Sequence, residues 1–101
     1  MKSITLEEFW KSEENIAIHC NTKEKAKKLL NAFDKMGMRW HSGERYSKFD
    51  LYFGYSQNTC YSNDHKFCSY GYYKSANYII YEYEEIDDIL LKEKENESNK
   101  E

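Results

Sequence analysis

Three cysteines and three histidines are the residues of this chain whose types could carry chemistry. Cys60, His65 and Cys68 have the spacing C-x4-H-x2-C, and the adjacent pair His19 and Cys20 could complete a set of four metal ligands. Structural zinc sites usually hold two ligand pairs, each pair roughly two to four residues apart, and only half of that pattern is present. We therefore expect buried or half-buried thiols, with no metal or other cofactor.

The same residues could form a nucleophile with a neighbouring base. His19 and His41 would face each other if their strands pair, and either could activate Cys20 or Cys60. However, the sequence contains no nucleophile elbow, phosphate-binding loop or dinucleotide fingerprint, and its four glycines are too few for most such motifs. We therefore predict a protein that is not an enzyme and assign no catalytic residue.

Tyrosine is the second chemical feature, because all ten tyrosines lie between Tyr46 and Tyr83. Tyrosine offers a large, rigid contact surface at low entropic cost, and the polar residues between the tyrosines add adaptable hydrogen bonding. Tyrosine is also a good strand former, so about five of the ten are expected in the core. The predicted aromatic binding face consists of Tyr46, Tyr52, Tyr55, Tyr61, Tyr70, Tyr72 and Tyr73.

Charge is divided between the body of the chain and its end. Residues 82–101 hold nine acids and three lysines, a net charge of −6, whereas residues 1–81 hold nine acids and twelve Lys and Arg, a net of +3. Duplex-DNA binders instead gather Lys and Arg on one face, so duplex DNA is not an expected partner. The predicted cationic contacts beside the tyrosines are Arg39, Arg45, Lys48, Lys66 and Lys74. The predicted acidic contacts, which could imitate a nucleic-acid backbone toward a basic protein, are Glu82, Glu84, Glu85, Asp87 and Asp88.

A chain of 101 residues allows one domain, which we place at residues 1–91, followed by a polar tail at 92–101 that we expect to be disordered. Thr5 and Glu8 match a capping box and predict a short helix over residues 6–14. A cap formed by Asn21 and Glu24, apolar residues at helical spacing and a stop at Gly37 predict the main amphipathic helix.

Extended segments are predicted at residues 16–20, 38–41, 51–55, 59–61, 67–71 and 77–83. Together they predict an α+β fold with an antiparallel sheet of about five strands and the main helix on one face. No stretch approaches the roughly 20 apolar residues of a membrane helix. The first residues also lack the apolar run of a secretory signal, so we expect a cytoplasmic protein without membrane contact.

Four segments carry a resemblance to a known group of proteins: Ile18–Ala26, Trp40–Gly43, Asn58–Tyr61 and Gly71–Tyr83. In this order they resemble small proteins of Gram-positive phages and prophages, over about residues 14–86. Some short phage proteins of this kind inhibit host defence, either by blocking CRISPR effector nucleases or by sequestering cyclic nucleotide signals. The resemblance carries no catalytic residues over to this chain.

Size, tyrosines and resemblance together predict a phage- or prophage-encoded binding protein that inhibits a host defence system stoichiometrically. A protein effector, such as a CRISPR nuclease complex, is the preferred target, because no Gly-rich or Arg-rich phosphate pocket is visible in the sequence. The first alternative is a sponge for a cyclic nucleotide immune signal. The second is a module for single-stranded nucleic acid, in which tyrosines stack bases while cations hold phosphates.

Assembly into a homodimer is predicted from the strand at residues 78–83, which is apolar on both sides apart from Glu82. The dimer would form across the tyrosine-rich sheet or through Ile86, Ile89 and Leu90, which give a short amphipathic turn or helix.

Overall fold

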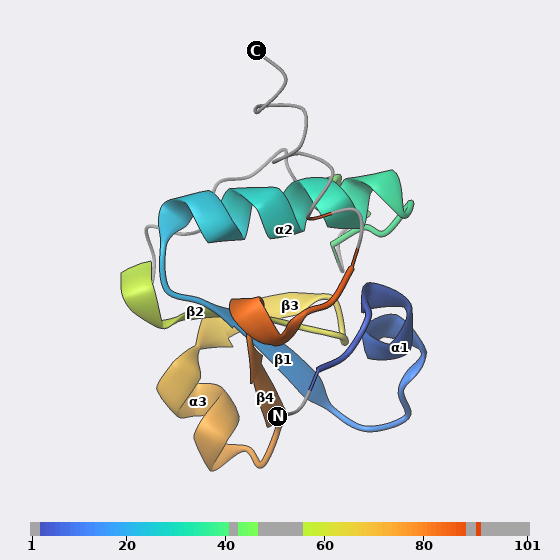
Figure 1. Ribbon diagram of the computed structural model, residues 1–101. Coiled ribbons are helices and arrows are strands. Elements are labelled where there is room, and N and C mark those ends of the chain that lie inside the picture. The colour runs from blue at the N-terminus through green and yellow to red at the C-terminus, as the bar shows by residue number, and fades with distance from the viewer. Residues whose placement is uncertain (1–2, 41–42, 47–55, 89–90, 92–101) are drawn as a thin grey trace.

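The structure is a computed structural model that describes residues 3–40, 43–46, 56–88 and 91. Its helices are α1 (Leu6–Lys11), α2 (Lys23–Lys35) and α3 (Tyr70–Ser75), with 3-10 helices η3 (Ser56–Asn58) and η4 (Tyr83–Glu85). Its strands are β1 (Ile16–Cys20), β2 (Thr59–Ser62), β3 (Lys66–Ser69) and β4 (Ile79–Glu82). Figure 1 shows α2 above the sheet, α3 below it and α1 beside it, which confirms the α+β class.

The sheet has four strands in the order β3-β2-β1-β4. β1 pairs antiparallel with β2, and β2 with β3, but β4 runs parallel to β1, with Ile18 opposite Tyr81. The prediction of an antiparallel sheet of about five strands is therefore wrong for the described residues. The reason is that β3, α3 and β4 form a crossover, and a helical crossover brings the next strand back in the same direction.

The crossover was missed because residues 67–71 were predicted to be one strand. Tyr70 and Gly71 instead begin α3, since the Ser69 side chain accepts a hydrogen bond from the backbone N–H of Tyr72 at 3.2 Å. α3 is followed by Asn77, whose φ of 66° lies in the left-handed region where Asn is tolerated.

Two other predicted strands have different outcomes. Within residues 38–40 only Arg39 pairs, in an isolated bridge to Arg45, so no strand forms there. The predicted strand at 51–55 and the predicted tail at 92–101 lie outside the described residues.

α1 begins where the sequence predicts. The N–H of Glu8 donates to Thr5 Oγ1 at 3.1 Å, and the N–H of Thr5 donates to Glu8 Oε1 at 2.9 Å, which confirms the capping box. The helix ends earlier than predicted, because Ser12 is already extended.

α2 has a different cap from the predicted one. Thr22, and not Asn21, is the N-cap residue, since its hydroxyl accepts from the N–H of Lys25 at 3.2 Å. The predicted stop is confirmed: Gly37 has a φ of +81°, which a residue without a Cβ adopts at little cost.

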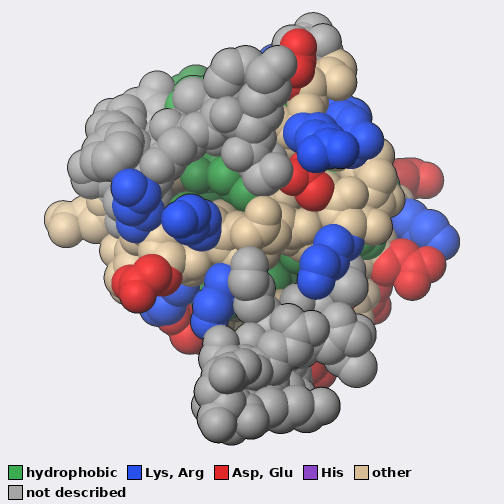
Figure 2. Space-filling model, turned by 90° about the horizontal axis from the view of Figure 1, so that it is seen from above, with side chains coloured by type: hydrophobic (Ala, Val, Ile, Leu, Met, Phe, Trp, Pro, Cys, Tyr) green, Lys and Arg blue, Asp and Glu red, His purple; other side chains and the backbone are tan. Residues whose placement is uncertain are grey.

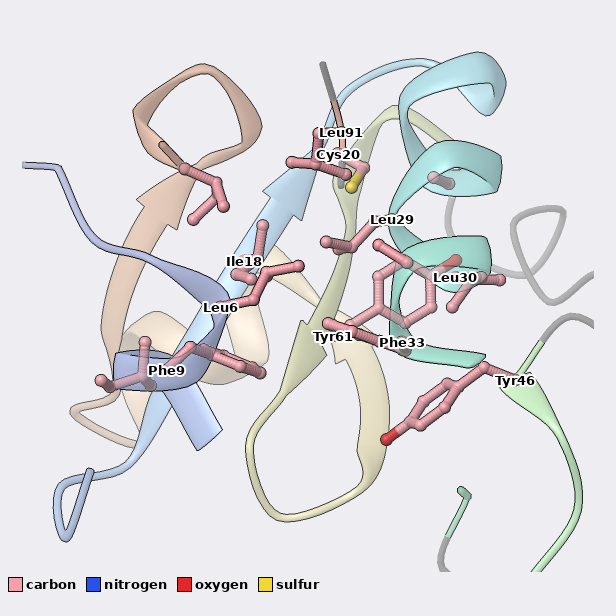
Figure 3. Close-up of a cluster of buried hydrophobic side chains, with 14 of the residues drawn as sticks. Leu6, Phe9, Ile18, Cys20, Leu29, Leu30, Phe33, Tyr46, Tyr61 and Leu91 are labelled. Carbon is pink, nitrogen blue, oxygen red and sulfur yellow. The ribbon is translucent and has the colours of Figure 1, made fainter. Parts of the chain in front are cut away.

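The main core lies between α2 and the upper face of the sheet (Figure 3). Leu29 and Phe33 of α2 pack there with Ile18 of β1, and Phe9 of α1 stacks on Phe33 with ring centroids 5.9 Å apart. A smaller cluster lies between the other face and α3, formed by Ala17 and Cys60 of the sheet and Tyr73 of α3. A different helix therefore packs on each face of the sheet.

The hairpin turn between β2 and β3 is fastened to the start of β1 by Asn63. Its side-chain amide donates to the carbonyls of Phe9 (3.1 Å) and Glu14 (2.9 Å), and its side-chain oxygen accepts from the N–H of Ile16 (3.2 Å). These bonds fix the turn that carries Asp64 and His65, the latter with a φ of 66°.

The face that carries α2 has mixed charge. Figure 2 looks down on this face and shows Lys and Arg side chains spread over it, with Asp and Glu among them. The exposed lysines of α2 are Lys23, Lys27 and Lys35. This pattern gives no support to a duplex-DNA surface, which needs an uninterrupted basic patch. In the described parts of the chain, no helix is both long and apolar enough to cross a bilayer.

The C-terminal segment packs against the N-terminal one. Ile86 is buried and forms a parallel bridge with Ile4, so it is not open to a second subunit in the second of the two predicted dimer interfaces. Ile89 and Leu90 lie outside the described residues. β4 is an edge strand, and its side chains are half-buried.

Candidate binding site

A pocket of about 170 Å³ opens where α3 and the residues after it meet the β2–β3 hairpin; we call it the hairpin pocket. A cavity of about 150 Å³ is enough for a benzene ring, so this pocket has room for one side chain or one ring. The hairpin and β3 contribute polar and apolar residues, while α3 and the segment before β4 contribute aromatic rings. The lining residues are Asp64, Lys66, Phe67, Cys68, Tyr72, Tyr73 and Tyr78.

A series of hydroxyl groups converges on the Asp64 carboxylate. Tyr73 Oη donates to Ser62 Oγ at 2.8 Å, Ser62 Oγ donates to Asp64 Oδ1, and Tyr78 Oη donates to Asp64 Oδ2 at 2.8 Å. Both oxygens of the carboxylate therefore accept a hydrogen bond. Two rings and one carboxylate of the pocket are held in fixed positions by this network.

The same hydrogen bonds also affect the pKa values of the groups in the pocket. Burial alone would raise the pKa of Asp64, but the hydrogen bonds from Ser62 and Tyr78 and the charge of Lys66 outweigh burial and lower it. Burial, reinforced by the bond to Asp64, raises the pKa of Tyr78 to about 12, and burial also raises the pKa of Tyr73. At neutral pH the carboxylate is therefore ionised and both phenols keep the protons they donate.

Three tyrosine rings form the aromatic walls of the hairpin pocket. The Tyr72 and Tyr73 centroids lie 5.4 Å apart with planes at 72°, and the Tyr73 and Tyr78 centroids lie 4.6 Å apart at 59°. Rings at such angles and distances pack edge to face against one another. Tyr72 is 55% exposed, the one large hydrophobic side chain of the described residues with an open surface.

Among the described residues, the tyrosines of the predicted aromatic face do not form a continuous surface. Tyr46 and Tyr61 are fully buried in the main core, and Tyr73 is only 1% exposed, so these three do not offer an open ring face. Sequence type does not distinguish a buried tyrosine from an exposed one, since both suit a strand or helix. Tyr70 is half-buried, and Tyr72 alone of the described members is exposed. Tyr52 and Tyr55 lie outside the described residues.

Only one of the predicted cations that the structure describes lines the hairpin pocket, namely Lys66. Lys74 is exposed in the last turn of α3. Arg39 and Arg45 pair with each other's backbone, and a guanidinium nitrogen of Arg39 donates to the Met38 carbonyl at 2.8 Å. Lys48 lies outside the described residues.

The predicted acidic contacts largely bind within the chain. Glu84 pairs with Lys25 of α2, and Glu85 accepts from the backbone N–H at the start of η4 at 2.8 Å. Asp88 accepts from the first N–H of α1 at 3.0 Å, and Asp87 is exposed. These contacts hold the C-terminal segment on the domain. Most of the predicted acidic contacts therefore have a structural role within the chain.

Glu82 contacts His19, which the sequence suggested as a base for Cys20 or Cys60. His19 Nδ1 lies 2.7 Å from Glu82 Oε1, and His19 Nε2 donates to the Gln57 carbonyl at 2.7 Å. Both ring nitrogens are therefore engaged. Burial raises the pKa of Cys20 well above its ordinary value and that of Cys60 to about 12, so neither buried thiol is a ready nucleophile.

The possible metal ligands do not converge within the described residues. Cys60 and Cys68 lie opposite each other on β2 and β3, whereas His65 sits in the turn and its Nδ1 contacts the Arg39 carbonyl at 2.9 Å. No group of three or more His, Cys, Asp or Glu side chains suited to a metal ion occurs in this part of the chain.

Asp64, Phe67 and Tyr78 line the pocket although the sequence did not indicate them as binding residues. Asp64 stands in a polar turn, and Phe67 and Tyr78 belong to segments that the sequence predicts only as strands. The three-residue turn between two apolar runs was a usable signal for the position of Asp64.

No family model, curated protein or solved structure matches the chain.

Proposed function

We propose that the protein is a stoichiometric binding protein that receives one side chain of a partner protein in the hairpin pocket. The observation that carries this proposal is a pocket of single-side-chain size, walled by three tyrosines and opened to solvent by Tyr72. Buried anchor side chains in such pockets dominate the energy of protein interfaces. The hydrogen-bonded Ser62 and Asp64 keep the pocket formed before binding, which reduces the entropic cost of association.

The partner that we propose is an effector of a host defence system, such as a CRISPR nuclease complex. The resemblance to small phage proteins supports this assignment. Inhibition by occupancy needs no reacting group, and the engagement of both His19 nitrogens is in keeping with a binding role.

A cyclic nucleotide is the alternative ligand, since a base could stack on Tyr72 with Lys66 near its phosphate. A cyclic nucleotide brings one charged phosphate for every nucleotide, and Lys66 alone would balance at most one of these charges. The protein partner is therefore favoured. A single-stranded nucleic-acid module needs successive exposed rings, and the burial of Tyr46, Tyr61 and Tyr73 removes support for it.

The test compares three proteins in a defended host: wild type, Tyr72→Ala and the control Glu13→Ala, which changes an exposed residue of the α1–β1 connection. We expect wild type and the control to raise phage plating and to co-purify with the effector. Loss of a central anchor contact weakens affinity by about 30-fold, so Tyr72→Ala should do neither.

Two results would overturn the proposal. The first is that phages carrying the wild-type gene plate no better than phages without it on every defended host tested. The second is that calorimetry with cyclic nucleotides gives tight binding while no effector co-purifies, which would favour the nucleotide sponge instead.

A further inference from the structure

The hairpin pocket combines an ionised carboxylate with aromatic faces. Asp64 accepts one hydrogen bond on each oxygen, from Ser62 and from Tyr78. The backbone N–H of Asp64 also bonds to its own carboxylate. A carboxylate has about four lone-pair sites, so about one remains for a donor that enters the pocket. A planar guanidinium can donate one N–H to this site while its face lies against an aromatic ring.

Three tyrosines line the space beside this carboxylate, and Tyr72 offers most of their open surface. Tyr73 is only 1% exposed and contacts both other rings, with centroids 5.4 Å from Tyr72 and 4.6 Å from Tyr78. The face of an aromatic ring carries negative charge density and attracts Arg and Lys cations within about 6 Å of its centre. Tyr72 can therefore take part in binding a cationic nitrogen group.

Other occupants fit this chemistry less well. An anion would face the Asp64 charge, and the hydroxyls of Tyr73 and Tyr78 that could bind it already donate elsewhere. A neutral apolar group would remove water from the carboxylate without replacing its hydrogen bonds, which is unfavourable.

Building on the proposed function, we propose that the side chain received by the hairpin pocket is cationic, and that it is the guanidinium group of an arginine of the partner. Lys66 is the feature of the lining that opposes this ligand. Its side chain is exposed, so its ammonium group can remain in water and move aside when a second cation enters. Removal of Lys66 should therefore tighten binding, which an anion site would not do.

The test uses the full chain and two small probes of equal shape, N-acetyl-arginine amide and the uncharged N-acetyl-citrulline amide, with inorganic phosphate as the anion. Cys68 lines the pocket, whereas Cys20 and Cys60 are buried, so protection of Cys68 from alkylation reports occupancy. We expect the arginine probe to protect at about tenfold lower concentration than the citrulline probe. Phosphate should not protect.

Two substitutions make the test specific for charge. Asp64→Asn should weaken binding of the arginine probe by about tenfold, and Lys66→Ala should strengthen it about threefold. Since Lys66 is exposed, Lys66→Ala leaves the fold intact even if Asp64→Asn does not. Equal protection by the two probes, or weaker binding of the arginine probe to Lys66→Ala, would overturn the inference.

The outcomes separate this inference from the proposed function. If partner binding depends on Tyr72 while the arginine and citrulline probes behave alike, the ligand class is wrong and the binding role stands. If the arginine probe binds as expected and no partner responds to Tyr72→Ala, the pocket chemistry stands and the proposed function fails.

Discussion

The hydrogen bond between Tyr73 and Ser62 offers a test of the network that holds the hairpin pocket in shape. Tyr73 Oη donates to Ser62 Oγ at 2.8 Å, and both side chains are buried. Tyr73→Phe removes this hydroxyl and leaves the ring that forms the wall of the pocket. Tyr72→Phe is the matched control, because it removes the hydroxyl of an exposed tyrosine one position away.

The expected magnitude follows from the partners that remain. After Tyr73→Phe, Ser62 still donates to Asp64, so no buried group is left without a hydrogen bond. The loss is then that of one neutral hydrogen bond, about 1 kcal/mol in the free energy of unfolding. For a domain of this size it lowers the melting temperature by about 4–8 °C. Tyr72→Phe should change stability by less than about 0.5 kcal/mol.

Urea unfolding followed by circular dichroism measures these values, and a double-mutant cycle with Ser62→Ala isolates the pair. Ser62→Ala should be the more harmful single change, because it also removes the bond to Asp64. The double mutant should be more stable than additivity predicts by about 1 kcal/mol, since the shared bond is lost only once. The reasoning is refuted if the two substitutions are additive, or if Tyr73→Phe behaves like the control Tyr72→Phe.

Three further measurements address the hairpin and the thiols. Iodoacetamide at pH 8 should modify Cys68 at least about tenfold faster than Cys20 or Cys60, and mass spectrometry showing three equal rates would contradict the burial of those two. Asn63→Ala should lower the free energy of unfolding by about 2 kcal/mol through the loss of its three side-chain hydrogen bonds, and an unchanged urea midpoint would contradict this. Because its lowered pKa makes ionised Asp64 stabilising, that contribution is fully present above the ordinary value of 3.8 and is lost as the pH falls through the folded pKa. Wild type and Asp64→Asn should therefore differ by a constant amount well above pH 3.8 and converge in stability as the pH falls below 3.8, and a difference that does not shrink there would contradict the charge assignment.

The elements that could be predicted from the sequence are those that local signals determine. The capping box of Thr5 and Glu8, the apolar spacing of α2 and the stop at Gly37 all act within a few residues. Each appears in the structure where it was predicted, apart from the shift of the α2 cap to Thr22. Alternation along residues 16–20 likewise gave β1 its correct bounds.

The parallel pairing of β4 could not be predicted in the same way. It depends on α3, a six-residue helix whose pattern of Tyr70, Gly71 and Tyr72 also suits a strand. Only the Ser69 cap and the turn at Asn77 distinguish the two, and both are weak local signals. A strand over residues 67–71 leaves no helix for a crossover, so the sequence predicts an antiparallel hairpin for the last strand.

The candidate site depended on burial and on contacts between distant residues. Tyr72, Tyr73 and Lys66 were singled out from their types, but the carboxylate that organises them, Asp64, is fourteen positions from its donor Tyr78. The same residue type also has opposite roles here, since Tyr61 fills the core while Tyr72 is open to solvent. Composition could indicate an aromatic binding surface but not its members.

The difference in length between α2 and α3 explains why an open site lies on one face of the sheet. Four strands at about 4.8 Å spacing are about 14 Å across, whereas a helix of six residues is about 9 Å long. The thirteen residues of α2, at about 20 Å, lie over the opposite face, where α1, Trp40 and Leu91 complete the main core. α3 leaves part of the other face uncovered, and that face carries His19, Glu82, Lys66 and Cys68, all of them polar or half-buried. The hairpin pocket forms at the boundary between the covered and the uncovered part, where Tyr73 of α3 packs on the sheet and Tyr72 of α3 faces solvent.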